Sequence, residues 1–173
     1  MAGAETSAWS SPRSTQGYRA RHGRHRGAHS HRKGLVPDVR YLLDTHAWVW
    51  AVLSDRRLGP RARRVLAALD ESERVGLAAI SLKEAAWHLA RGRMVLAKEN
   101  ASWADWLRDA SSLPSLEILP LTVEVAIESE RFSTRFPTDP ADRLIAATAR
   151  VHDLTLLTRD RVMRASPEVK TLW

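Results

Sequence analysis

The chain has 173 residues, no cysteine and a formal net charge of +7. This length is enough for one domain with a substantial core, and the absence of cysteine excludes a disulfide framework and any thiolate zinc site. No apolar run approaches the roughly 18 residues of a membrane span, and no apolar stretch of about 7–15 residues follows the basic N-terminus as in a secretory signal. We therefore expect a cytoplasmic protein with no membrane segment.

The positive charge is concentrated near the N-terminus. Residues 1–40 hold eight basic and two acidic residues, whereas the rest of the chain holds 19 basic and 18 acidic residues. Residues 1–38 are rich in Ser, Gly, Arg and His and lack apolar periodicity, which predicts a disordered basic tail or a start site placed too far upstream. The alternative is a basic arm that contacts RNA or DNA. The folded domain is expected to span residues 39–173.

Within the expected domain, apolar strands alternate with helices. Strands are expected at 40–44, 75–79, 116–119, 154–158 and 170–173. Helices are expected at 46–53, 60–69, 101–111, 161–165, in a segment that Ser81 opens, in one that Thr122 caps and that reaches about Phe132, and in one that Asp139 caps with Pro140 in its first turn. This alternation is typical of a three-layer α/β/α fold with a small central parallel sheet of about four to five strands.

Four acidic residues each occupy a place where a strand ends or a helix begins: Asp44, Glu84, Asp142 and Asp160. In a parallel α/β sheet such places lie along one edge. Several crowded carboxylates cannot all stay ionised without a cation, and hard oxygen ligands suit Mg²⁺ or Mn²⁺. The pattern therefore predicts a divalent-metal site at the carboxyl edge of the sheet.

Each of these positions also has a structural explanation. Asp44 and Asp160 are suited to cap the helices that follow them. The pattern Ser81-x-x-Glu84 matches a capping box, in which the glutamate reaches back to the N–H of the cap. Asp142, in the first turn of a helix, complements the helix dipole. The two explanations are compatible, because a helix N-terminus can orient a carboxylate that binds metal.

Four short motifs occur in a characteristic order and spacing. They are Leu-Leu-Asp-Thr-His-Ala-Trp (42–48), Ile-Ser-Leu-Lys-Glu-Ala-Ala (80–86), Asp-Pro-Ala-Asp-Arg-Leu-Ile-Ala-Ala-Thr-Ala (139–149) and Leu-Leu-Thr-Arg-Asp (156–160). From about residue 40 to the C-terminus the chain resembles a PIN-domain ribonuclease, and closely resembles the toxin of a VapBC-type toxin–antitoxin pair. The resemblance implies a PIN-like fold.

The resemblance also implies the roles of individual residues. The catalytic metal pocket, for Mg²⁺ or Mn²⁺, would be formed by Asp44, Glu84, Asp142 and Asp160. Companion positions beside it would be Thr45, Asp139 and Thr158. Candidates for contacts with RNA phosphates are Arg91, Arg143 and Arg159, with a solvated surface as the alternative for each.

Two departures from the family pattern lie in the second motif. Lys83 stands where the family usually has tryptophan, and Trp87 offers a ring one turn later. The basic pair after this helix is Arg91 and Arg93, where lysines are more usual. Neither departure changes an acidic position.

The implied activity is an endoribonuclease that hydrolyses RNA phosphodiesters through metal-activated water, leaving 5′-phosphate and 3′-hydroxyl ends. The implied partners are a small antitoxin that blocks the acidic pocket and a second copy of the chain. The alternatives are a catalytically silent PIN-like binding or scaffold module, and a PIN nuclease of RNA processing.

Histidine and tryptophan supply weaker signals. The chain lacks a zinc-type His-Glu-x-x-His pattern, so His46, His88 and His152 are expected to be core or surface residues. The tryptophans at 48, 50, 87, 103 and 106 fall in expected helices, which favours core or dimer packing over stacking on RNA.

Overall fold

The computed structural model describes residues 38–70, 72–94, 96 and 102–173. Nearly all of the expected tail lies outside these residues, and Asp38, its last residue, instead begins the first strand. The strands are β1 (Asp38–Leu43), β2 (Glu73–Ala78), β3 (Leu116–Leu119), β4 (Thr155–Leu157) and β5 (Thr171–Leu172). The helices are α1 (Thr45–Val52), α2 (Pro60–Ala67), α3 (Ala79–Ala90), α4 (Trp103–Ser111), α5 (Val123–Ser129), α6 (Pro140–Val151) and α7 (Arg161–Ala165). None of the helices in these described segments is long and apolar enough to cross a bilayer.

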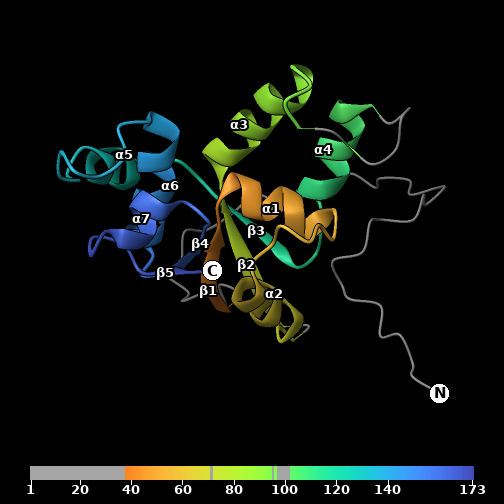
Figure 1. The fold of residues 1–173 in the computed structure, drawn as a ribbon, viewed down its shortest axis with the longest axis horizontal. Coiled ribbons are helices and arrows are strands. Elements are labelled where there is room, and N and C mark those ends of the chain that lie inside the picture. The colour runs from red at the N-terminus through yellow and green to blue at the C-terminus, as the bar shows by residue number, and fades with distance from the viewer. Residues whose placement is uncertain (1–37, 71, 95, 97–101) are drawn as a thin grey trace, which may run out of the picture.

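The five strands form one sheet in the order β3-β2-β1-β4-β5, and every neighbouring pair is parallel. From the central β1, the chain builds outward through β2 and β3, then crosses back to add β4 and β5 on the other side (Figure 1). The strand order therefore reverses between β1 and β4. In open α/β sheets, the crevice outside the carboxyl ends of the strands at such a reversal is the usual binding place.

Alternating leucines in the central strands build two cores, one on each face of the sheet. Leu42 and Leu156 pack into the core beneath α5, α6 and α7. Leu43 and Leu157 point the other way and pack with α1, α2, α4 and part of α3. This period of two is what a strand buried on both faces requires. The expected three-layer α/β/α fold with a small parallel sheet is confirmed (Figure 1).

Several helix boundaries follow from local capping, and others differ from expectation by up to three residues. Thr122 and Asp139 cap α5 and α6 as expected, with side-chain oxygens accepting backbone N–H groups. Ser81 does not open α3, which begins two residues earlier at Ala79, so the expected capping box is wrong. Helix α5 ends at Ser129, before the expected Phe132, which instead lies in the following loop, where it is buried and stacks on Phe136.

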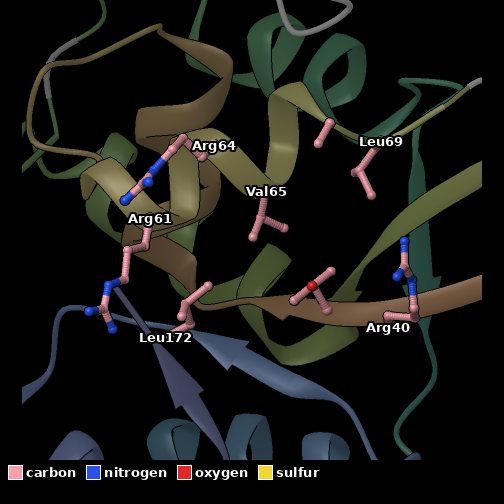
Figure 2. Close-up of a pocket in the computed structure, with 8 residues that line it drawn as sticks. Arg40, Arg61, Arg64, Val65, Leu69 and Leu172 are labelled. Atoms are coloured by element: carbon pink, nitrogen blue, oxygen red, sulfur yellow. The ribbon is translucent and has the colours of Figure 1, made fainter.

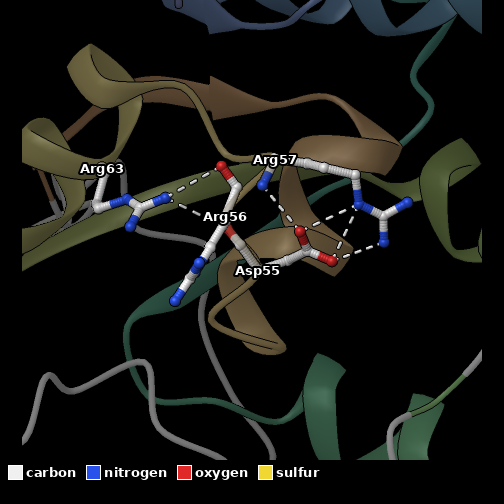
Figure 3. A network of polar contacts seen from close by, with 4 residues as sticks. All are labelled: Asp55, Arg56, Arg57 and Arg63. Atoms are coloured by element: carbon white, nitrogen blue, oxygen red, sulfur yellow. Dashed lines mark hydrogen bonds and ion pairs between the residues drawn. The ribbon is translucent and has the colours of Figure 1, made fainter.

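A polar network shapes the connection between α1 and α2 (Figure 3). The carboxylate of Asp55 accepts hydrogen bonds from the backbone N–H and the guanidinium of Arg57. Arg63, on α2, donates back to backbone carbonyls of the same turn.

The turn brings Gly59 so close to Trp173 that a Cβ added to the glycine would lie 2.8 Å from the tryptophan ring. This contact helps to hold the C-terminal end of the chain beside α2.

The tryptophans are divided between core and surface. Trp48 and Trp50 are buried, and Trp106 lies 5.8 Å from Trp48 between ring centroids, which confirms the expected core packing for these rings. Trp103 is instead 42% exposed, and Trp87 is half-buried. Trp87 contacts two arginines, whose arrangement is described below.

Candidate active site

The carboxyl ends of β1 and β4 place three of the predicted site residues together. Asp44 directly follows β1, and Thr158 and Asp160 follow β4. The backbone N–H of Asp44 donates to the carbonyl of Leu157 at 3.2 Å, which continues the pairing of the two strands to their ends. The side chains that leave these ends therefore enter the same crevice, where the strand order reverses.

Two helices bring the remaining acidic side chains to this crevice. Glu84 lies in the second turn of α3, and its Oε2 accepts a hydrogen bond of 2.5 Å from Oγ1 of the buried Thr45. Asp142 lies in the first turn of α6. Asp139 caps that turn by accepting from the backbone N–H groups of Ala141 and Asp142 at 2.8 and 3.3 Å. The positions of both acids thus depend on helix starts that the sheet orients.

These residues share one cavity of about 280 Å³. It is lined by Asp44, Thr45, His46, Glu84, Asp139, Asp142, Ile145, Thr158, Arg159, Asp160 and Met163. The structure thus brings together the four predicted acidic residues, their three predicted companions and one of the three predicted arginines.

The surroundings of Asp142 raise its pKa. Burial raises the pKa of this carboxyl from 3.8 to about 7, and the negative charges of Asp139, Glu84, Asp160 and Asp44 add to the effect in that order. Each neighbour disfavours a further negative charge in the pocket. A cation placed among these groups would reverse that repulsion.

The pKa values of Asp44 and His46 are also shifted from their usual values. Burial raises the pKa of Asp44, against the lowering effect of hydrogen bonds from Ala47 N–H and the hydroxyl of Thr158. Burial lowers the pKa of His46 below 6.5, against the opposite effect of the neighbouring carboxylates of Asp44 and Glu84. His46 is therefore neutral at pH 7 and offers no charge to balance the acids.

Capping and site geometry coincide at the strand ends. Asp44 accepts from Ala47 N–H at 2.7 Å and begins α1, and Asp160 accepts from Met163 N–H at 2.8 Å and begins α7. The structural explanation of these two residues is therefore correct, and it fixes the orientation of each carboxylate. Thr158 completes this arrangement, because its hydroxyl accepts from the backbone N–H of Asp160 at 3.0 Å.

The donor set fits a hard divalent cation in its chemistry. Carboxylate and hydroxyl oxygens line the pocket, and the crowding at Asp142 is the electrostatic condition that a cation relieves. Among the described residues, no group of three or more histidine or acidic side chains is already arranged to hold an ion.

The three predicted phosphate-contact arginines occupy different surroundings. Arg159 lines the pocket and lies over the Trp50 ring, 4.9 Å from its centroid. Arg91 lies at the end of α3, outside the lining of the pocket, over the Trp87 ring.

Arg143 is directed into the protein and not toward the pocket. Its guanidinium donates to the carbonyls of Pro137, Ser129 and Ser133 at 2.9, 3.2 and 3.2 Å. These bonds tie the loop before α6 to the helix. Its donors are thus engaged with backbone carbonyls, which favours a structural role over the predicted contact with phosphate.

A larger cavity of about 560 Å³ lies toward the amino end of β1, away from the acidic crevice (Figure 2). Arg61 and Arg64 of α2 and Arg40 of β1 border it, with Val65 and Leu172 among its apolar lining. No acidic side chain of the described residues lines it. It lacks the groups for hydrolytic chemistry, so the smaller acidic cavity is the candidate active site.

Sequence reasoning missed one polar member of the pocket. His46 was expected to be a core or surface histidine, yet it lines the cavity between Thr45 and the helix α3. The available signal was its position two residues after Asp44, in the first turn of the helix that this residue caps. Ile145 and Met163 supply apolar lining and have no comparable signal in the sequence.

The raised pKa of Asp142 predicts an effect on stability. Ionisation of this carboxyl in the folded chain is unfavourable, and the cost grows as the pH rises from about 4 toward about 7, because the unfolded chain ionises first. In EDTA, Asp142→Asn should therefore raise the melting temperature by at least about 2 °C at pH 8, and by less at pH 5. Asp109→Asn, on the exposed side of α4, serves as the control. Thermal melts giving equal shifts at both pH values would contradict this account.

The contacts of Arg143 predict a structural role. Arg143→Gln should lower the free energy of unfolding by about 1–3 kcal/mol, because three carbonyls lose charged donors. Arg135→Gln, an exposed change in the same loop, should have little effect. Urea denaturation measures both. An Arg143→Gln protein of unchanged stability would show that the loop does not depend on these bonds.

Comparisons with known proteins place the chain in a family. Residues 41–168 match the PIN domain. The chain is 34% identical over 134 residues to Ribonuclease VapC22 of Mycobacterium tuberculosis, covering 76% of this chain and 97% of that protein. The solved structure of VapBC2 from Rickettsia felis, bound to a DNA fragment from their promoter, matches with a TM-score of 0.58 at 19% identity, covering 78% of this chain and 97% of that one. FitAcB from Neisseria gonorrhoeae matches with a TM-score of 0.56 at 26% identity, covering 77% and 96%. The fold of this chain, its acidic pocket and these similarities together show that the chain belongs to the PIN-domain family, among the VapC-type members.

Proposed function

We propose that this chain is a divalent-metal-dependent endoribonuclease and the toxin of a VapBC-type toxin–antitoxin pair. The observation that carries the proposal is the gathering of five carboxylates at one cavity, where burial and then the four neighbouring charges raise the pKa of Asp142 to about 7. The ribonuclease named among its relatives, at 34% identity over most of both chains, supports RNA as the substrate.

Four carboxylates would hold the cation, Mg²⁺ or Mn²⁺. Asp44 and Asp142 are proposed as principal ligands, since burial makes their charges the most costly to leave uncompensated. Glu84 and Asp160 would bind directly or through water. When bound, the cation would activate a water molecule and stabilise the negative charge that develops on the attacked phosphate.

The other residues of the pocket orient these ligands. Thr45 donates to Glu84 and so fixes the carboxylate of α3 against the start of α1. The hydroxyl of Thr158 restrains Asp44, and Asp139 caps the turn that carries Asp142. Arg159, which lines the same cavity, would contact a phosphate of the bound strand. Positioning of this kind matters because small displacements of reacting groups greatly reduce rates.

The size of the cavity favours a single strand as the substrate. A volume of about 280 Å³ suits a phosphodiester and its adjoining sugar, and not a base-paired helix. Unpaired segments are also where proteins read RNA sequence, because their bases are open to contact. We propose that cleavage takes place in such a segment, in the cytoplasm.

Two protein partners follow from the proposed toxin function. A cognate antitoxin would cover the acidic pocket, for which a basic side chain is the complementary group. A second copy of the chain would cover apolar surface, and Leu121, Val123 and Ile127 are each more than half exposed around α5.

With the antitoxin bound, metal-dependent cleavage should cease. Sedimentation equilibrium of the purified toxin should give the mass of a dimer, and a monomer would contradict that part of the proposal.

The activity is tested with native total RNA and the purified protein. With Mg²⁺ or Mn²⁺ we expect discrete cuts that carry 5′-phosphates, and with EDTA or with Asp44→Asn we expect none. Asp109→Asn, which leaves the pocket intact, is the matched control and should cut normally. Absence of cuts, together with absence of metal binding by calorimetry, would favour the alternative of a catalytically silent PIN-like module.

A further inference from the structure

We propose that an aromatic and basic track along α3 binds the single-stranded RNA on one side of the cleaved phosphate. The track consists of His46, His88, Trp87, Arg91 and Arg93. The inference rests on the proposed function, because it takes RNA to be the strand that enters the acidic pocket. It adds to that function a binding surface that leads out of the pocket.

Helix α3 leads from the acidic pocket to the arginines of the track. Glu84 of the pocket, His88 and Arg91 are spaced by four and three residues, so they lie on one face of α3. Nε2 of His88 lies 3.7 Å from Oε1 of Glu84. From Glu84 to Arg91 the helix advances by about 10 Å. This is the length of about three nucleotides at the ~3.4 Å spacing of stacked bases.

A series of rings begins inside the pocket. His46 lines the cavity, and its ring centroid lies 5.7 Å from that of His88. The rings of His88 and Trp87 are 4.9 Å apart in an edge-to-face arrangement. All three side chains are partly exposed. Base–aromatic stacking is tolerant of sequence, because every base has a π-face.

A pair of guanidinium groups lies at the far end of the track. Arg91 and Arg93 lie over the Trp87 ring at 4.7 and 4.3 Å from its centroid. Both residues are exposed. A base that stacks on this ring would therefore take the place of a guanidinium group, which would then be free to turn toward a phosphate of the same strand. Guanidinium groups bind phosphate through paired N–H donors and also stack on bases.

The track would supply the positive charge that the acidic pocket lacks. Without a cation, the acidic pocket repels a phosphodiester, because its lining includes five carboxylates and one arginine. Two arginines about two helical turns away would attract the same strand by its neighbouring phosphates. The strand would thus be anchored outside the pocket, while the cation completes the site at the cleaved bond.

The test uses the full-length chain with Asp44→Asn, so that RNA is bound and not cut. Fluorescence anisotropy with Mg²⁺ compares a labelled mixed-sequence single strand of about 12 nucleotides with an abasic strand of equal length. Trp87→Ala should weaken binding of the RNA by about 5- to 100-fold, and of the abasic strand by much less. Trp87→Phe should restore most of the loss. Thermal melts of each variant establish that it is folded.

The arginines give a second, independent readout. Arg91→Gln with Arg93→Gln should weaken binding of both strands and lower the salt dependence by about 1.4 in the log–log slope, for two lost phosphate contacts. The matched controls are Trp103→Ala, a more exposed ring on α4, and the pair Arg56→Gln, before α2, with Arg61→Gln, on α2. Neither control should change the affinity or the slope.

The outcomes separate the track from the catalytic function. If a folded Trp87→Ala protein binds RNA as its parent does, or loses the same affinity for both strands, the track is wrong even when the wild type cuts RNA. If base-dependent binding requires Trp87 but the wild type never cuts RNA, the track stands and the proposed catalysis fails.

Discussion

Repulsion among carboxylates at the ends of β1 and β4 is the interaction on which the site depends. The parallel sheet, with its reversal of strand order, directs two loops and the starts of two helices into one crevice. Burial and the neighbouring carboxylates together raise the pKa of Asp142 to about 7, which shows the electrostatic cost of gathering these acids. A fold that gathers like charges in this way is poised to bind an opposite charge.

The same carboxylates also help to build the fold that crowds them. Asp44, Asp139 and Asp160 each cap a helix by accepting its first N–H groups. The positive end of a helix dipole partly offsets the negative charge of its cap. Structure and chemistry are therefore not separable at these positions. This double use explains why each acid, taken alone, has a sufficient structural explanation.

Positive charge is kept at the margin of the site. His46 is neutral at pH 7, and Arg159 is the one arginine in the described lining of the pocket. Arg91 and Arg93 are held by Trp87 beyond it. This separation is the one that the proposed function requires, because a cation would enter the acidic pocket while a polyanion would approach along the basic surface beside it.

The sequence by itself determined the layered α/β fold and the convergence of the four acids, because both rest on local signals. Strand alternation, a proline in the first turn and caps such as Asp139 and Asp160 act within a few residues. Only the tertiary structure decided features that depend on distant partners. Arg143 could be assigned to loop carbonyls, and His46 to the pocket, only once the loop before α6 and the helix α3 were in place. Ser81 failed as a cap for the same reason: the end of β2 starts α3 at Ala79, before the local signal applies.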